Sequence, residues 1–225
     1  MSYMRISNYI QELRNAFALF GVDYKEKVLG KSAEGRNIIS FLLPRMEVSN
    51  LIMGFPHPNE PLSQVMMMQI ARKAEQFQNQ GNEFWFLIPV WDIDGAIRNQ
   101  DWFLNADSIV EMVNGWYRPA ANRQVEWDFP LESGGYKHSS SLPETEIIKN
   151  LLDEVHPQRL ISLHNGIVGN AYCYISQGLH DKARDLSKAL QLSGLDIAEE
   201  PPVPYSEVID LGLFRYLMPL NRLIG

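Results

Sequence analysis

Cysteine is nearly absent from this sequence, in which Cys173 is the single thiol among 225 residues. One thiol cannot form an intrachain disulfide, and it excludes a structural zinc site built from several cysteines. A metal ion in this protein would therefore be held by histidine and carboxylate side chains. The chain has 5 His, so the candidate ligands are few.

Positive charge and long apolar runs are also scarce. The chain has 20 Lys and Arg against 27 Asp and Glu, a net charge of -7 that argues against nucleic acid as a partner. Its apolar runs, LIMGF and FWFLIPVW, have the length of strands, whereas crossing a bilayer takes about 20 residues. The N-terminus lacks the continuous apolar core of a signal peptide. We therefore expect a cytoplasmic protein that binds neither nucleic acid nor membrane.

Hydrophobic periodicity divides the chain into alternating strands and helices. Apolar residues at helical spacing, or strong helix formers, predict helices over 6–20, 62–77, 143–155 and 181–192. Strand-like runs cover 24–29, 37–43, 50–55, 84–90, 159–163 and 172–175. This alternation predicts an α/β fold with a mixed, largely parallel sheet flanked by helices.

The organisation of the chain indicates one domain. With 45% hydrophobic residues, the chain can bury a substantial core. Neither a repeat nor a shift in composition marks a boundary, so we expect a single domain over residues 1–225. Residues 105–141 are rich in Asn, Pro, Gly and Ser and lack periodicity. We expect them to form long loops around an active site.

Two histidines follow apolar, strand-like runs. His57 comes directly after LIMGFP and stands three residues before Glu60, and His164 ends the run RLISLH. In α/β folds the carboxyl ends of strands collect binding groups, so these side chains can meet there. Two histidines and one glutamate would leave a fourth zinc position open for water, as in catalytic zinc sites. By spacing alone the signal is weak, and hydrogen-bonded loop histidines explain the pattern better than a metal site does.

Several segments occur in an order that resembles the zinc carboxypeptidases of the M14 peptidase family. GKSAEGRNI (30–38) is similar to the family tract "G-x-S-x-x-G-R-x-I", and GFPHPNEP (54–61) to its His-x-x-Glu zinc pair. PVWDIDGA (89–96) resembles the "N-P-D-G" segment and LPETEIIKNLL (142–152) the "E-P-E-T" helix start. LISLHNG (160–166) resembles the strand that delivers the last zinc histidine. The resemblance runs from Gly30 to at least Gly166.

The resemblance implies a fold, a cofactor and a set of roles. It implies the carboxypeptidase-like, three-layer fold of the phosphorylase/hydrolase-like type. It implies one Zn²⁺ ion bound by His57, Glu60 and His164, with Arg118 stabilising the oxyanion that forms when water attacks the substrate carbonyl. The implied partner is a peptide or a peptide-like small molecule.

The sequence departs from the family in the tract that holds the substrate's terminal carboxylate. VEWDFP (125–130) stands in place of "V-D-x-N-R-N-F-P", so Trp127 and Asp128 occupy the positions of an Asn-Arg pair. Because an acidic side chain repels a carboxylate, specificity for a free C-terminus is in question. Asn122 and Arg123 are the nearby candidates for that role, since the arginine fork grips a carboxylate through two hydrogen bonds.

The family's general base, a glutamate on a late strand, has no evident counterpart. The final segment GLFRYLMPLNRLIG contains no carboxylate, and Glu199, Glu200 and Glu207 precede it in a proline-rich stretch. We expect a chain that lacks the family's last strand, as a fragment or as a natural short form. Two functions stay open: a zinc-dependent hydrolase of an amide bond, and a weak or inactive relative that serves as a binding or regulatory protein. The sequence leaves the oligomeric state open.

Overall fold

The computed structural model describes residues 3–43, 50–80, 85–139, 142–166, 169–204 and 206–216. They form two compact units. Unit 1 comprises Met1–Leu131 and His138–Asn165, and unit 2 comprises Glu132–Lys137 and Gly166–Gly225. We expected a single domain over residues 1–225. The division into two compact units does not by itself decide whether they form one domain, so this expectation stays a prediction.

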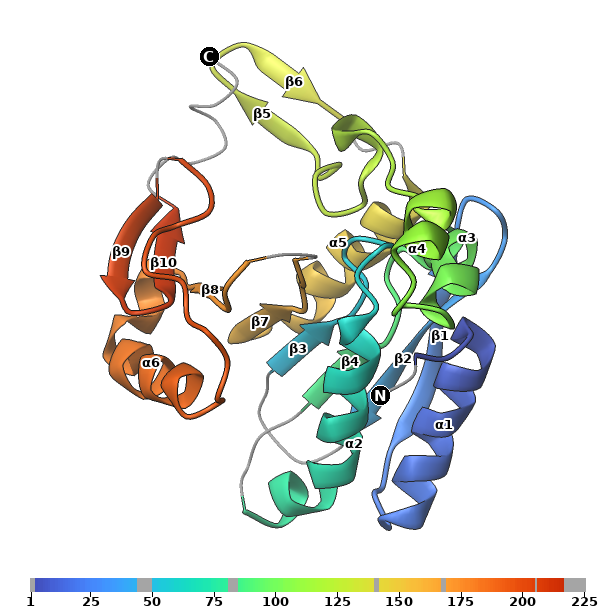
Figure 1. The fold of residues 1–225 in the computed structure, drawn as a ribbon. Helices are drawn as coiled ribbons and strands as arrows, with labels where there is room; N and C mark the ends of the chain where they lie inside the picture. The colour runs from blue at the N-terminus through green and yellow to red at the C-terminus, as the bar shows by residue number, and fades with distance from the viewer. Residues whose placement is uncertain are drawn as a thin grey trace. The chain divides into compact units, whose positions relative to one another are not determined.

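A mixed five-stranded sheet forms the centre of unit 1 (Figure 1), in the order β1-β2-β4-β3-β7. Its strands are β1 (Lys25–Lys31), β2 (Asn37–Leu43), β3 (Asn50–Met53), β4 (Trp85–Ile88) and β7 (Arg159–Ser162). The first two form an antiparallel hairpin, and β2 pairs antiparallel with β4. β3 runs parallel to both β4 and β7. The expected α/β fold with a mixed sheet flanked by helices is therefore confirmed.

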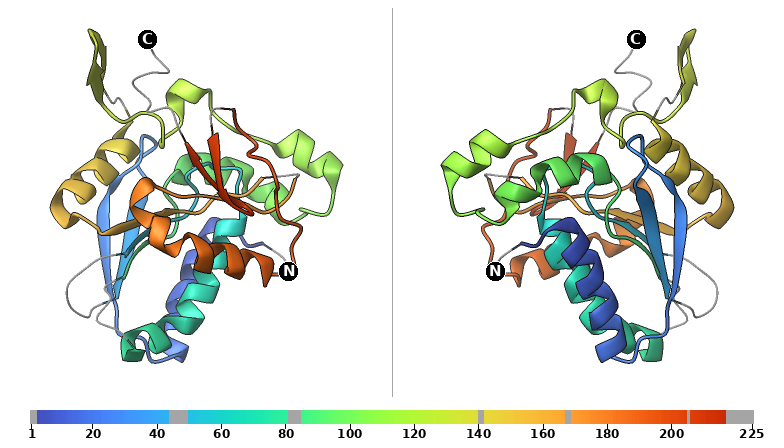
Figure 2. Two further views of the ribbon diagram at one scale, coloured as in Figure 1. Left: turned by 90° about the vertical axis from the view of Figure 1, so that its left-hand side faces the viewer. Right: turned by 90° about the vertical axis from the view of Figure 1, so that its right-hand side faces the viewer.

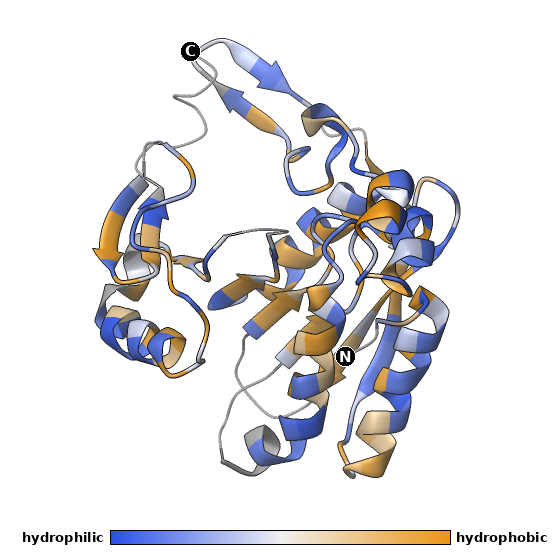
Figure 3. Cartoon of the chain, in the orientation of Figure 1, coloured by the Kyte–Doolittle hydropathy of each residue, from blue (hydrophilic) through white to orange (hydrophobic). Residues whose placement is uncertain are grey.

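Helices cover both faces of this sheet. Figure 2 shows α5 (Pro143–Val155) on one side of the strands, and α1 (Ile6–Leu19) and α2 (Leu62–Gln80) on the other. The helix α1 turns an apolar stripe inward, because Tyr9 and Phe17 are fully buried. All four residues of β3 are buried, and the central strands are mostly hydrophobic (Figure 3).

The segment expected as long loops contains regular structure, so that prediction is wrong. Residues 105–141 include α4 (Ile109–Gly115), the 3-10 helix η1 (Ala121–Arg123) and the strands β5 (Leu131–Ser133) and β6 (Tyr136–His138). The Ser108 hydroxyl accepts a hydrogen bond from the Glu111 amide and caps α4. The helix α4 has only 7 residues and buries none of them, so it is too short for a periodicity argument to detect. A further helix, α3 (Ile93–Phe103), was not expected.

Unit 2 contains a three-stranded sheet in the order β8-β10-β9. Its elements are β8 (Cys173–Tyr174), η2 (Gln177–Lys182), α6 (Ala183–Gln191), β9 (Ser206–Asp210) and β10 (Leu213–Tyr216). Ile175, Ala183 and Leu213 form its buried core. The strands β9 and β10 were not expected from the proline-rich sequence before them. Across the described parts of both units, no helix is long and apolar enough to cross a membrane.

Gly54 links β3 to the loop that carries His57, and the backbone packs tightly around it. Its amide donates to Ile88 O at 2.9 Å and its carbonyl accepts from Trp91 N at 2.9 Å. A Cβ added here would lie 2.4 Å from Pro89 O and 3.2 Å from Ser63 Cβ. We predict that Gly54→Ala lowers the free energy of unfolding by about 1–3 kcal/mol, as overpacking does.

Urea unfolding would measure this change, with Gly178→Ala as the control. A Cβ at Gly178 would meet no atom within 4 Å, so its stability should stay close to that of the parent protein. Equal stabilities of the two variants would contradict the close approach at Gly54.

Asp92 is a buried carboxyl group that caps α3 by accepting a hydrogen bond from Gly95 N at 2.8 Å. Burial raises its pKa from 3.8 to about 6, because the Gly95 amide offsets this only in part and Glu144 and Asp94 add repulsion. The folded state therefore favours the neutral acid. The stability that this neutral form contributes is fully present below pH 4 and is lost as the pH rises through about 6.

We predict that Asp92→Asn, which keeps an oxygen acceptor for Gly95 N, weakens this pH dependence. At pH 7 the variant should be more stable than the parent by up to ~3 kcal/mol, the equivalent of two pKa units. Urea unfolding at pH 4 and pH 7 tests it. The same loss of stability between the two pH values in both proteins would show that Asp92 is not its source.

Candidate metal centre

Two parallel strands deliver the histidines of the site. β3 and β7 pair in a register that places Met53 opposite Ser162, and Leu163 N extends the ladder by donating to Met53 O at 2.9 Å. Both strands end at the same edge of the sheet, as parallel strands must. His164 follows β7 after one residue, and the loop after β3 turns through Phe55, whose φ is 50°, before it reaches His57.

Glu60 lies between the two imidazole rings. A turn closed by Glu60 N and His57 O at 3.2 Å brings its side chain back toward His57. Its carboxylate oxygens lie 2.8 Å from His57 Nδ1 and 3.0 Å from His164 Nδ1. The two Nδ1 atoms are 3.2 Å apart. The structure therefore brings together the three residues that were expected to bind zinc.

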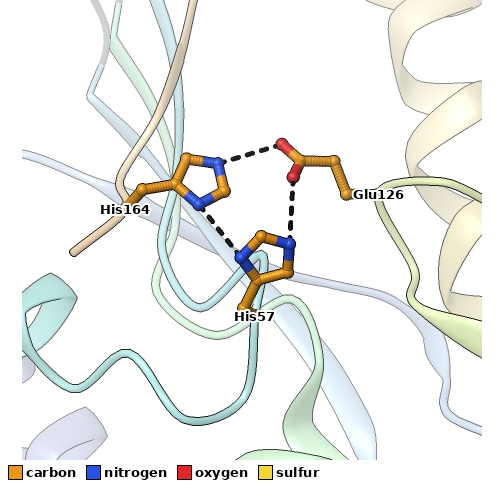
Figure 4. Close-up of side chains that lie close together, drawn as sticks. All are labelled: His57, Glu126 and His164. Carbon is orange, nitrogen blue, oxygen red and sulfur yellow. Dashed lines mark hydrogen bonds and ion pairs between the residues drawn. The ribbon is translucent and has the colours of Figure 1, made fainter. Parts of the chain in front are cut away.

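A second carboxylate, Glu126, contacts the opposite nitrogens of both rings (Figure 4). Its oxygens lie 3.1 Å from His164 Nε2 and 3.4 Å from His57 Nε2. The Ser162 hydroxyl also donates to Glu126, at 3.0 Å. His57, Glu126 and His164 offer ligand atoms that all lie within 4.8 Å of one another. Glu126 was not among the expected site residues, although in the tract VEWDFP it occupies the position of the aspartate of the family tract "V-D-x-N-R-N-F-P".

The charges of the site depend on one another. Burial alone would raise the pKa of Glu60, but the hydrogen bonds to His164 and His57 outweigh it and lower that pKa to about 2. Burial likewise opposes a charge on His164, yet Glu126 and Glu60 raise its pKa to about 9. The pKa of Glu126 is lowered, because the contact with His164 outweighs its burial. The two carboxylates thus create a position that favours a cation.

The donor atoms fit a zinc ion. Two facing Nδ1 atoms 3.2 Å apart cannot both carry hydrogen toward each other. If the hydrogen of each ring is on Nε2, facing Glu126, then both Nδ1 atoms carry lone pairs that point toward the Glu60 carboxylate and toward each other. These electron-rich atoms repel one another unless a proton or a metal ion lies between them. Two ligands of a tetrahedral zinc ion, each about 2 Å from the metal, are ~3.3 Å apart, close to the observed spacing.

Arg118, the residue predicted to stabilise the oxyanion, lies at the edge of this cluster. One guanidinium nitrogen, Nη1, is 3.4 Å from Glu60 Oε1, and the other, Nη2, donates to Gln124 Oε1 at 3.2 Å. Its side chain is 34% exposed, so it is partly open to a ligand. A cation in this position can stabilise negative charge that develops beside the histidines.

The expected substrate-binding residues lie apart from these contacts. Asn122 and Arg123 are exposed on η1, and neither side chain forms a hydrogen bond or ion pair with another described residue. Asp128, by contrast, is 1% exposed. It accepts from Leu142 N at 2.9 Å and pairs with His138 Nε2 at 3.0 Å. Its charge is therefore committed to neighbours and is not presented to solvent.

The late glutamates belong to unit 2. Glu207 lies on β9 and forms an ion pair with Arg215 on β10. Glu199 and Glu200 are exposed in an irregular segment before β9. The general base therefore stays unassigned among the described residues.

Comparisons with known proteins support the fold. No protein-family model matches the sequence, and no curated protein does either. Solved structures do match. A candidate metallopeptidase from Shewanella amazonensis has a TM-score of 0.65 at 15% identity, over 93% of this chain and 75% of that one. A candidate metallopeptidase from Shewanella baltica has a TM-score of 0.64 at 18% identity, over 93% and 74%.

Carboxypeptidase A from Helicoverpa armigera is also similar, with a TM-score of 0.56 and 13% identity over 95% of this chain. The chain spans 57% of the length of that carboxypeptidase and half the length of a candidate carboxypeptidase from Burkholderia mallei. At such low identities the likeness concerns the fold. The protein has a carboxypeptidase-like α/β fold, and His57, Glu126 and His164 form a cluster that could hold a metal ion.

Proposed function

We propose that this protein is a zinc-dependent hydrolase that cleaves an amide bond in a peptide or peptide-like substrate. The observation that carries the proposal is the convergence of His57 Nδ1, His164 Nδ1 and the Glu60 carboxylate, with the two nitrogens 3.2 Å apart. These three residues would bind one Zn²⁺ ion. The carboxypeptidase-like fold of the solved structures that match supports this assignment.

Each residue of the site has a distinct role in this proposal. A bound zinc ion acidifies a water molecule and polarises a carbonyl group. Glu126, assisted by Ser162, would orient the His164 ring through the hydrogen bond to its Nε2, and it also lies 3.4 Å from His57 Nε2. Arg118 offers its guanidinium to the oxyanion of the substrate.

We assign the binding of the substrate's terminal carboxylate to Asn122 and Arg123. Both are exposed on η1, six and five residues before Asp128 in the chain. Because Asp128 is hydrogen-bonded to His138 and Leu142 N, its charge is not directed at such a ligand. An exposed arginine with no partner among the described side chains is available to form the two hydrogen bonds that a carboxylate accepts.

A second candidate is a non-catalytic relative that keeps the fold, with or without zinc, as a binding or regulatory protein. Both carboxylates at the centre, Glu60 and Glu126, are already engaged with imidazole nitrogens. Glu207 is paired with Arg215. Within the described residues we therefore assign none as a general base, whose loss costs a factor of about 10²–10⁴ in rate.

We predict that the purified protein binds one zinc ion per chain and that His57→Ala and His164→Ala abolish this binding. Glu60→Gln should weaken it more than Glu126→Gln, because Glu60 would contact the metal directly. For Glu126, which would act through the rings, the expected loss of affinity is about 10–100-fold. Zinc content after dialysis and calorimetric titration of the metal-free protein measure both.

The control is His156→Asn, which changes an exposed histidine at the end of α5 and should leave zinc binding unchanged. Asparagine suits the left-handed backbone of that position. A larger loss in Glu126→Gln than in Glu60→Gln would place the ion on the Nε2 side of the rings. Zinc retained in both alanine variants would refute the metal centre.

We predict that the zinc-loaded protein hydrolyses N-blocked peptides with a free C-terminus and that Arg118→Ala lowers kcat by about 10²–10³. Arg123→Ala should instead raise KM for these peptides, because it would remove a group that binds the carboxylate. Matched peptides with an amidated C-terminus separate the two effects. Equal cleavage of both sets would exclude Arg123 from the role, and no cleavage of either set would favour the non-catalytic candidate.

A further inference from the structure

Arg118 lies on an irregular segment, so its position must be fixed by contacts outside regular structure. Residues 116–120 connect α4 to η1 and belong to neither. The arginine is nevertheless held close enough to Glu60 for a 3.4 Å contact. Two buried side-chain amides, those of Asn99 and Gln124, account for this placement.

Asn99 holds the backbone immediately before Arg118. Its side chain is fully buried on α3. Its Nδ2 donates to Tyr117 O at 2.8 Å, and its Oδ1 accepts from Tyr117 N at 2.9 Å. The amide thus pairs with both backbone polar groups of one residue, as a neighbouring strand would.

The remaining hydrogen-bonding capacity of Asn99 ties it to its own helix. Nδ2 also donates to Gly95 O at 2.9 Å, and Oδ1 also accepts from Trp102 Nε1 at 2.8 Å. Trp102 in turn stacks on Trp116, with ring centroids 5.9 Å apart. The segment that leaves α4 is therefore fastened to α3 by an aromatic stack and by an amide with every hydrogen used.

Gln124 holds the other end of Arg118. Its Oε1 accepts from the guanidinium Nη2 at 3.2 Å, while its Nε2 donates to Pro119 O at 3.0 Å. The side chain is buried, so its orientation is fixed by these two contacts. With Nη2 directed toward Gln124, Nη1 is left on the side of Glu60.

We propose that Asn99 and Gln124 are positioning residues that aim the Arg118 guanidinium at the metal centre. Asn99 fixes the position of the backbone at Tyr117, next to Arg118. Gln124 fixes the orientation of the Arg118 guanidinium plane. Neither contacts His57, Glu60 or His164 through a hydrogen bond or ion pair that the structure shows, so both act through Arg118. The inference rests on the proposed function for the purpose of Arg118, but the placement itself can be measured without zinc or activity.

The first test follows the Arg118 Nε–H signal in proton–nitrogen NMR spectra of the metal-free protein, assigned by its loss in Arg118→Lys. We expect Asn99→Ala and Gln124→Ala each to move this signal toward that of a solvated arginine. Gln124→Glu, which keeps an acceptor for Nη2, should retain the held position. Gln11→Ala, an exposed amide on α1, is the matched control and should change nothing.

The second test uses the zinc-loaded protein and inorganic phosphate as a probe anion. Removing one charge-assisted contact lowers affinity by roughly 10–100-fold, so we expect Arg118→Ala and Gln124→Ala each to weaken binding. The double variant should bind phosphate no more weakly than Arg118→Ala alone, because a positioning residue has nothing left to position. A double loss equal to the product of the single losses would overturn the proposal.

The two tests also separate this inference from the proposed function. If zinc does not bind, the NMR signal still decides whether the amides hold Arg118. If zinc binds but the signal stays unchanged in both alanine variants, the positioning role fails and the metal centre stands. Should Asn99→Ala fail to fold, Gln124→Ala and its rescue by Gln124→Glu decide the outcome.

Discussion

The parallel pairing of β3 with β7 is the interaction on which the candidate centre depends. His57 and His164 are far apart in the sequence, and only the register that places Met53 opposite Ser162 brings them together. A slip by one residue would shift one strand end by ~3.3 Å and turn its side chains to the other face of the sheet. All four residues of β3 are buried, so a slip would force each side chain into a space packed for its neighbour. The hydrophobic core thus determines the geometry of a polar site at its edge.

The charged residues of that polar site depend on one another for their stability. Glu60 is 4% exposed, and an ionised carboxylate at such a depth is costly unless cations surround it. His164, whose pKa is raised to about 9, and Arg118 provide the positive partners, while Glu126 contacts both rings on their other side. Removing one member would leave a buried charge without its partner, which costs more than the pair contributes. A metal ion between the Nδ1 atoms would satisfy all three donors at once, whereas a single proton can be bound by only one.

The sequence predicts the elements whose signals are local and long. Pro143–Val155 and Asn37–Leu43 have the predicted bounds, because a proline in the first helical turn and a continuous apolar run are strong local signals. The helix Ile93–Phe103 escaped prediction, since its first residues belong to the tract PVWDIDGA and its cap, Asp92, resembles a loop residue. The strands β9 and β10 escaped it because they have only 5 and 4 residues, and alternation over so few positions is a weak signal.

The candidate site shows the same division. The triad His57, Glu60 and His164 could be named because each residue directly follows a recognisable apolar run or turn. The contacts of Glu126 with His57 and His164 could not be predicted from the sequence, because they depend on the path that the segment after η1 takes in the folded chain.

Asp128 illustrates how tertiary structure changes the meaning of a charge. In the sequence its carboxyl group argues against binding a substrate's terminal carboxylate, since like charges repel. In the structure that carboxyl group is 1% exposed and hydrogen-bonded to His138 and Leu142 N. A buried carboxyl group whose oxygens already accept these hydrogen bonds does not face a ligand in solvent. The electrostatic objection to a carboxylate ligand therefore weakens, and what remains is the need for a positive group to bind it. We propose that Arg123, exposed on η1 a few residues earlier, supplies that charge.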